Sequence, residues 1–314
     1  MWDIHTYECL RIIGVPSARD TDRREALLYN PHAFTEQHHL PIYPIPTRPL
    51  PPSIYHVPDY YHEASILCLQ YDSKIMVTGS SDCTLIIWNI LTFQPIHHLD
   101  RHCAGVLDIA FDERKIISCS KDASICVWDR ATGELLQLLT GHHGPVNAVQ
   151  LRGNLFVSAS GEGCAKLWNL GHDIGTSQSA KFVKEFRSEE RGLACVEFSE
   201  DAKYILAGGN DQVVYKYDTA TGSRVGAMEG HGNLVRSLYL DGANGRVVSG
   251  SYDLSLRVWD FGSGREIQRF EGWTSSWLLS AKSDYRRIVS TSQDGRVAIM
   301  DFGFGVEGVE ALES

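Results

Sequence analysis

A pattern that recurs about every 40 to 45 residues constrains this chain more than any other feature. Each copy has an apolar run, small residues, an acidic turn residue, an alternating apolar run, an aromatic residue and then Asp or Asn. The plain copies are KIMVTGSSDCTLIIWNI, KIISCSKDASICVWDRATGELLQLLTGH and RVVSGSYDLSLRVWDFGSGREIQRFEG. The weaker copies are LFVSASGEGCAKLWNL, YILAGGNDQVVYKYDTATGSRV and RIVSTSQDGRVAIMDFG. A repeat of this length indicates a fold built from copies of one unit.

Each unit is rich in Val, Ile, Leu and Tyr between turn residues, which favours strands over helices. The turn Asp positions are Asp82, Asp122, Asp211, Asp253 and Asp294, with Gly163 in their place in one copy. The Trp positions are Trp88, Trp128, Trp168 and Trp259, with Tyr217 and Met300 as replacements. A four-stranded unit cannot bury both faces alone, so its neighbours must stack around an axis. We therefore predict an all-β fold, a β-propeller.

The copies resemble the WD40-repeat family. In that family a His before the first strand, a hydroxyl on the second strand, the turn Asp and the Trp form one hydrogen-bonded network. The resemblance implies a structural network in three blades, from His62, Asp82 and Trp88, from His102, Asp122 and Trp128, and from His231, Asp253 and Trp259, with Thr78, Ser118 and Ser249 as hydroxyls. His142 and Trp168 keep part of the pattern, but Gly163 is expected to remove the acid. The two blades without Trp should be held more by packing.

Sets of His, Ser and Asp resemble catalytic triads, but a triad occurs once in a cleft. A set that recurs in blade after blade is structural. The sequence also has no G-x-S-x-G, H-E-x-x-H or phosphate-loop motif. We therefore predict no catalytic residue, no cofactor and no enzyme activity.

Net charge and cysteine content limit which other classes of function the chain can have. The net charge of -10 disfavours binding of nucleic acid or anionic lipid, and no apolar run is long enough for a membrane span. None of the eight cysteines forms a C-x-x-C pair, so no metal site is predicted. Most lie in apolar segments, which favours buried, reduced thiols in an intracellular protein, cytoplasmic or nuclear.

Six repeats have recognisable first, second and third strands, beginning near Ser65, Val106, Val146, Leu193, Val235 and Trp277. Upstream, residues 1–14 (MWDIHTYECLRIIG) read as the end of another blade, with a final strand from Glu8 to Ile13. Either the last repeat donates strands to this half blade, or the chain is a truncated seven-bladed ring. Truncation is favoured, because a half blade leaves edge amides unpaired. The predicted divisions are remnant strands 1–14, an insertion loop 15–61 and the blades 62–314.

The insertion contains LPIYPIPTRPLPPSIYHVP. This density of proline prevents ladder pairing and favours extended polyproline. It is interpreted as a loop over one face, either as a ligand for a proline-binding module or as an insertion without a partner.

A short link leads into the second strand in several copies: CLQYDSKIMVTGSSD, IAFDERKIISCSKD and LYLDGANGRVVSGSYD. In this feature the chain resembles the F-box/WD-repeat proteins. Those proteins are substrate receptors of Skp–cullin–F-box ubiquitin ligases. The resemblance covers about Tyr61 to Gly303 and implies other proteins as partners, among them phosphorylated degron peptides bound to the top face. This sequence shows no F-box region before the blades, so a Skp-type adaptor is expected only with an upstream F-box.

In that family, top-face arginines hold the phosphate because guanidinium makes bidentate, charge-assisted contacts. By motif, the resemblance places Arg236 at such a position, with Tyr252 and Lys121 in adjoining turns. The equivalents of Arg236 are Leu67, Leu107, Asn147, Ala194 and Leu278, so a pocket of several arginines is not predicted. Arg101 and Arg191 lie in top-facing loops. Trp277, at a position where Val is usual, is either an exposed binding anchor or packed under its loop.

The main hypothesis is thus a protein–protein interaction module, and more specifically the substrate-recognition propeller of an F-box/WD-repeat subunit. The alternative is a non-catalytic WD-repeat scaffold for another intracellular complex.

Overall fold

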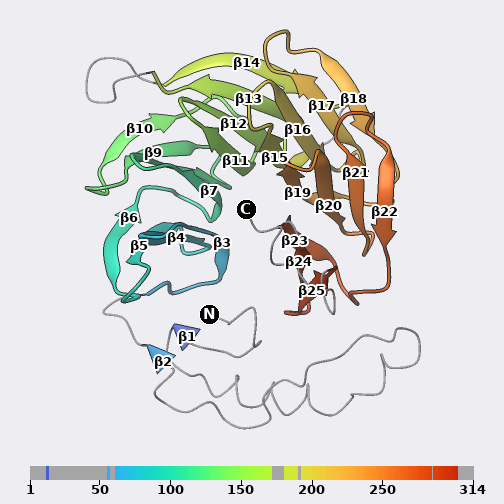
Figure 1. Cartoon of the computed structure of the whole chain (residues 1–314). Coiled ribbons are helices and arrows are strands. Elements are labelled where there is room, and N and C mark those ends of the chain that lie inside the picture. Colours follow the sequence, from blue (N-terminus) through green and yellow to red (C-terminus); the bar gives the residue numbers. More distant parts are fainter. Residues whose placement is uncertain are drawn as a thin grey trace.

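The computed structural model describes residues 61–171, 180–189, 192–284 and 286–302, and the backbone of residues 12–13 and 55–56. The residues from 61 onward form six antiparallel sheets, five of four strands and one of three. The sheets stand side by side around a common centre, as the blades of a propeller (Figure 1). The predicted all-β propeller with six blades is confirmed. None of the described residues belongs to a helix long and apolar enough to cross a membrane.

Blades 1 to 6 follow the chain order. Blade 1 has β3 (Ile66–Tyr71), β4 (Ile75–Ser80), β5 (Thr84–Asn89) and β6 (Pro95–Asp100); blade 2 has β7 (Val106–Phe111), β8 (Lys115–Ser120), β9 (Ile125–Asp129) and β10 (Leu135–Leu139). Blade 3 has β11 (Val146–Arg152), β12 (Leu155–Ser160), β13 (Cys164–Asn169) and β14 (Lys181–Arg187); blade 4 has β15 (Leu193–Phe198), β16 (Tyr204–Gly209), β17 (Val214–Asp218) and β18 (Arg224–Met228). Blade 5 has β19 (Val235–Asp241), β20 (Arg246–Ser251), β21 (Leu256–Asp260) and β22 (Glu266–Phe270); blade 6 has β23 (Leu278–Ser283), β24 (Arg287–Ser292) and β25 (Val297–Asp301).

Two further strands, β1 (Ile12–Ile13) and β2 (Tyr55–His56), pair with each other in parallel. The other residues of the predicted remnant 1–14, and all of the insertion 15–61 except β2 and Tyr61, lie outside the described residues. The half blade and the polyproline loop therefore stay predictions.

The Asp residues of the turns explain why the strands end where they do. Asp112 accepts hydrogen bonds at Oδ1 from the amides of Arg114 and Lys115, which closes the turn between β7 and β8. Asp129 does the same for Ala131 and Thr132 between β9 and β10. Side-chain caps of this kind favour tight turns over continued strands.

The first strand of each blade lies nearest the centre and contacts the first strand of the next blade, from β3 through to β23. Polar side chains on these strands join neighbouring blades. Gln70 accepts a hydrogen bond from the Phe111 amide (3.0 Å), and Asp108 accepts one from the Val149 amide (3.0 Å). These bonds satisfy polar groups that the packed centre of the ring would otherwise leave unpaired.

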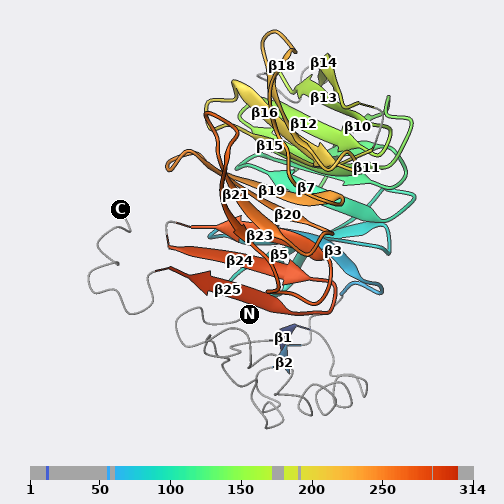
Figure 2. The same cartoon turned by 90° about the vertical axis from the view of Figure 1, so that its right-hand side faces the viewer.

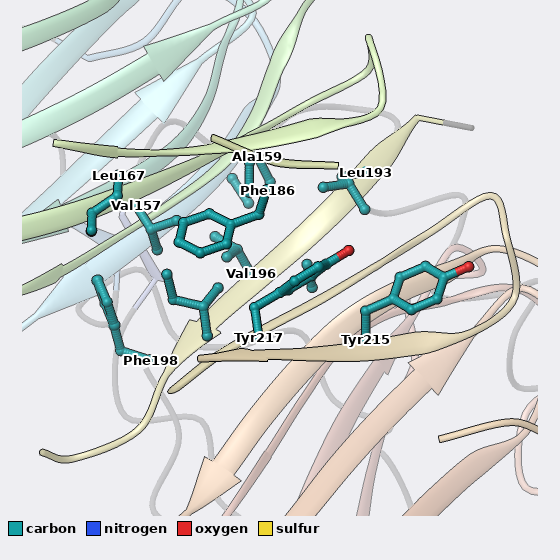
Figure 3. Close-up of a cluster of buried hydrophobic side chains, with 13 residues drawn as sticks. Val157, Ala159, Leu167, Phe186, Leu193, Val196, Phe198, Tyr215 and Tyr217 are labelled. Atoms are coloured by element: carbon teal, nitrogen blue, oxygen red, sulfur yellow. The ribbon is translucent and has the colours of Figure 1, made fainter. Parts of the chain in front are cut away.

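The second strands lie between two neighbours, and every residue of β4 and β8 is buried. Apolar clusters fill the space between successive blades. Figure 3 shows the cluster between blades 3 and 4, in which Phe186 packs against Tyr217 with their ring centroids 5.5 Å apart. Tyr217 stands where other blades have Trp, so this blade boundary relies on aromatic packing.

Every first strand has a register shift just after its first residue, as between Val235 and Ser237. The same shift occurs in the other five blades. An extra residue at a bulge is left out of the ladder and its side chain is turned to a new direction. In blade 5 this residue is Arg236.

Candidate functional site

We define the top face by the loops that precede each first strand and by the turns between second and third strands. Blade 2 shows how the loops of the top face are held in place. Trp128 Nε1 donates to Ser118 Oγ (2.9 Å), and His102 bonds to Ser118 through Nε2 (2.9 Å) and to Asp122 through Nδ1 (3.1 Å). Asp122 also accepts the amide of Cys103 (2.8 Å). One chain of hydrogen bonds therefore joins the loop, the turn and two strands.

In this network each hydrogen-bond donor meets an acceptor. Burial lowers the pKa of His102, so the imidazole is neutral at pH 7. Its Nδ1–H then donates to Asp122, and its Nε2 accepts the Ser118 hydroxyl proton. The tautomer is assigned from these partners.

Two other sets have the same geometry. In blade 1, His62 bonds to Asp82 (3.0 Å) and Thr78 (2.8 Å), and Trp88 donates to Thr78 (2.8 Å). In blade 5 the corresponding bonds are 2.7 to 2.9 Å long and join His231, Ser249, Asp253 and Trp259. Burial alone would raise the pKa of the Asp82 carboxyl, but the hydrogen bonds from Thr84 hold that pKa at about 2.

The expectation that Gly163 removes the acid from blade 3 is wrong. Glu162 supplies it, because Glu162 Oε1 lies 2.6 Å from His142 Nδ1 and Glu162 Oε2 accepts the amide of His143 (2.8 Å). His142 also bonds to Ser158 (2.8 Å), as does Trp168 (2.9 Å). The spacing contained the signal, since Glu162 lies two residues after Ser160, as Asp122 lies two after Ser120.

Blades 4 and 6 use other bonds. Asp211 accepts the Tyr215 hydroxyl (3.1 Å), and Asp294 accepts the hydroxyls of Ser275 (2.7 Å) and Ser292 (2.5 Å). The acidic turn residue is thus kept in these blades, but its partner is a hydroxyl.

Blade 3 also brings a His, a Glu and a Cys together. The possible ligand atoms of His142, Glu162 and Cys164 all lie within 4.8 Å of one another. Burial and the hydrogen bond to Glu162 raise the pKa of Cys164 to about 12, whereas a metal requires the thiolate. The ammonium of Lys166 lies 3.5 Å from Glu162. This charge and the protonated thiol fit the structural network better than a metal centre.

The seven described cysteines are unpaired thiols. Four of them, Cys119, Cys126, Cys164 and Cys195, are buried, while Cys103 is exposed. Cys103 therefore departs from the expected burial. Cys9 lies outside the described residues.

Two aromatic rings of the top face meet across a blade boundary. Tyr252, in the turn after β20, stacks on Trp277, just before β23, with centroids 4.6 Å apart and planes 11° apart. Trp277 is 45% exposed. Trp277 is therefore not packed away beneath its loop, and the two rings form a flat apolar platform open to solvent.

The predicted alignment of Trp277 with the usual Val is wrong by one residue. Leu278 pairs with Ser292 as Val235 pairs with Ser251, so Leu278 takes the Val position and is buried. Trp277 lies one residue earlier, and its carbonyl accepts the Gln293 amide (3.0 Å). The same shift makes Leu279, not Leu278, the equivalent of Arg236.

Arg236 is half-buried at the bulge of β19, and its Nη1 donates to the carbonyl of Ala194 in blade 4 (3.2 Å). Its charge also reaches Asp108 in blade 2. Burial raises the pKa of the Asp108 carboxyl, and Arg236 counters that rise. The guanidinium thus bonds to the first strand of the preceding blade, and one of its donors is already engaged.

Two of the remaining predicted basic residues belong to blade 2, on the loop and the turn that the His102–Asp122 bond joins. Lys121, in the turn of blade 2, and Arg101, before β7, are both exposed. Arg191 lies outside the described residues. The structure brings together Tyr252 and Trp277 from the predicted set, while Arg236 bonds to the neighbouring blade.

Comparison with known proteins agrees with the fold. The chain is 28% identical over 167 residues to cilia- and flagella-associated protein 52 of Chlamydomonas reinhardtii, which covers 51% of this chain and 26% of that protein. It is 24% identical over 147 residues to meiotic fizzy-related protein 1 of Schizosaccharomyces pombe, covering 46% and 33%. It is 23% identical over 108 residues to eukaryotic translation initiation factor 3 subunit I of the same yeast, covering 34% and 33%. The chain spans about a third or less of the length of these curated relatives.

Among solved structures, the computationally designed Ika8 protein is similar, with a TM-score of 0.65 and 27% identity over 76% of this chain and 72% of that one. The family described as WD domain, G-beta repeat matches residues 57–89, 93–129, 133–169, 180–218 and 222–260. These matches cover more than half of the 314 residues, and the chain therefore belongs to the WD40-repeat family.

Proposed function

We propose that this WD40 propeller is a non-catalytic protein-binding module whose top-face platform, Tyr252 and Trp277, anchors a segment of the partner protein. The observation that carries the proposal is the stacked, solvent-open pair of rings. Aromatic side chains are enriched among the residues that dominate binding energy at protein interfaces. The stacking fixes both rings before binding, so little side-chain entropy is lost when a partner covers them.

The test replaces Trp277 with Ala in the full chain and quantifies partners recovered with the tagged protein from cells. We expect recovery of the main partners to fall at least tenfold, about 1.4 kcal/mol. Leu91→Ala is the control, because Leu91 is 81% exposed in the turn after β5, at the opposite end of that strand from the top face. Unchanged recovery with a folded Trp277→Ala protein would exclude the platform as the anchor.

At a finer level, we propose the substrate-recognition role of an F-box/WD-repeat receptor, with a phosphorylated peptide as ligand. Arg236 supports this role, because its guanidinium has donors beyond the one that bonds to the Ala194 carbonyl. Arg236→Gln keeps an amide that can donate to Ala194 and removes the charge. A partner held through its phosphate should no longer bind the Arg236→Gln variant, and should no longer bind the wild type once the partner is treated with phosphatase. Equal binding by the wild type, by the variant and by the wild type with the treated partner would exclude phosphate recognition by Arg236.

The ligase assignment is tested by the other proteins in the complex. A Skp-type adaptor and a cullin should accompany a form of the protein that carries an F-box, and their absence from that complex would exclude the ligase role. The alternative is a scaffold in another intracellular assembly, which the subunit name of the translation-initiation relative favours. In that case the platform still binds a partner, but the partners form one stable complex without ligase subunits.

A further inference from the structure

Two cysteines whose thiols take no part in the networks lie on the top face, one in each of two neighbouring blades. Cys83 is in the turn between β4 and β5 of blade 1, and Cys103 is in the loop between β6 and β7. Cys103 is exposed and Cys83 is partly exposed, whereas four of the other described cysteines are buried. In the side view of Figure 2 the strands run from one face of the ring to the other, so the turns and loops gather at the two faces. The two thiols therefore lie at the same face, within reach of solvent.

The strand β6 brings the chain past Cys83 before it reaches Cys103. Thr84, the residue after Cys83, pairs with Asp100, the last residue of β6. Cys103 follows Asp100 by three residues along the chain. The loop that carries Cys103 therefore starts beside the turn that carries Cys83.

The same loop also packs on that turn just before it enters blade 2. A Cβ atom added to Gly105 would lie 3.3 Å from the Cα of Ser81, so Gly105 is in direct contact with the turn. The Cys83 thiol donates to the Ser81 carbonyl, with the sulfur and oxygen atoms 3.8 Å apart. The thiol is thus held against the residue that Gly105 contacts, and Cys103 lies two residues before Gly105.

The electrostatic surroundings of Cys83 agree with this placement. Burial raises the pKa of the Cys83 thiol, and the Asp82 carboxylate, the Asp122 carboxylate and Cys103 raise it further. Asp122 belongs to blade 2, where it accepts the Cys103 amide (2.8 Å). Charges near a protein surface act on one another over about 10 Å. A raised pKa leaves the reduced pair without a stabilised thiolate, which favours a disulfide at equilibrium.

The two cysteines are not part of the repeat pattern. The equivalent residues of the other described blades carry no sulfur: Ala123, Gly163, Gln212, Leu254 and Gly295 in place of Cys83, and Glu63, His143 and Gly232 in place of Cys103. These positions hold varied side chains, so the blade fold does not require a thiol at either of them. Two neighbouring thiols at one blade boundary therefore point to a property of this chain and not of the repeat.

We propose that Cys83 and Cys103 are a redox modification site, at which a peroxide converts the two thiols into a disulfide that joins blade 1 to blade 2. Cys103, the more exposed thiol, attacks one peroxide oxygen as its thiolate, becomes a sulfenic acid and releases one water. The Cys83 thiolate then attacks the Cys103 sulfur, and the sulfenic hydroxyl leaves as a second water. Two thiols and one hydrogen peroxide thus give one disulfide and two waters. A dithiol restores the two thiols by exchange.

The geometry limits how much must move for this bond to form. A disulfide joins Cα atoms that lie within about 7 Å of each other. The pairing at Thr84 and the contact at Gly105 hold the two segments side by side, so the bond needs side-chain rotation and a small shift of the exposed loop. The link then fixes the loop before β7 to the turn of blade 1, which alters this part of the top face in oxidising conditions.

The test treats the full chain with hydrogen peroxide or, in a second arm, with the thiol oxidant diamide, blocks the remaining thiols and digests the protein with trypsin without reductant. Trypsin cuts after Lys74, Arg101 and Arg114, so each of the two cysteines lies in a peptide that contains no other cysteine. We expect mass spectrometry of the monomeric protein to find these two peptides joined through Cys83 and Cys103. Dithiothreitol should separate them.

The matched control is Cys103→Ser with His143→Cys, which moves the second thiol to the equivalent loop position one blade further on. His143 is exposed, as Cys103 is. Its link to Cys83 should form at roughly a tenth of the wild-type yield or less, because the two sites are too far apart for a disulfide. Equal yields from the two proteins, a link between Cys83 and Cys103 that forms only between two molecules, or no link with either oxidant would overturn the proposal.

Discussion

Replacing His102 with Ala is expected to lower the free energy of unfolding by about 3 kcal/mol. His102 is 4% exposed and joins Asp122 and Ser118. Its removal leaves a cavity and deprives a buried hydroxyl and a carboxylate of one partner each. The effect should be of this size because the bonds form one chain, in which each partner orients the next. Urea unfolding followed by tryptophan fluorescence measures it.

The same substitution at His142 tests whether Glu162 serves as the acid of blade 3. His142→Ala should cost about as much as His102→Ala. His143→Ala is the control, since His143 is the exposed neighbour of His142. If His142→Ala and His143→Ala unfold at the same urea concentration, the bonds of His142 contribute no stability to blade 3.

The repeat made the blades predictable from the sequence, because each copy shows the same order of apolar runs and turn residues. The first strands begin at the predicted residue in four blades and one residue later, at Ile66 and Leu278, in the other two. The network residues were predictable for the same reason. Glu162 was missed because the other blades have Asp at this place, although the position itself followed from Ser160.

The platform was only partly predictable. Tyr252 and Trp277 could be placed on the top face, but their stacking depends on the bulge and on how two blades meet. The bulge adds one residue to the first strand, which shifts any alignment made by counting alone. The direction of Arg236 also depends on this bulge, and a strand pattern carries no signal for it.

The burial of single polar residues on the first strands was not predictable either. Glu197 is the one charged residue of β15, whose other residues are all apolar, and it is only 7% exposed. The charged groups that influence the pKa of Glu197 are Lys282 of β23, Arg152 of β11 and Asp108 of β7. Burial raises the pKa of the Glu197 carboxyl from 4.5 to about 7, although Lys282 opposes that rise.

Glu197→Gln is therefore expected to stabilise the protein at alkaline pH. A carboxyl with a raised pKa in the folded state binds its proton more tightly there than in the unfolded state. The stability it provides is fully present below pH 4.5 and is lost as pH rises through about 7. The loss amounts to at most about 3 kcal/mol for this shift.

The measurement is urea unfolding of the wild type and Glu197→Gln at pH 5, 6, 7 and 8. The wild type should lose stability across this range more steeply than the variant, so that the variant is the more stable protein at pH 8. Glu200→Gln, in the exposed turn that follows the same strand, should follow the wild-type slope. Parallel curves for wild type and Glu197→Gln would mean that Glu197 ionises in the folded ring as easily as in the unfolded chain, and that water reaches the carboxyl in the folded protein.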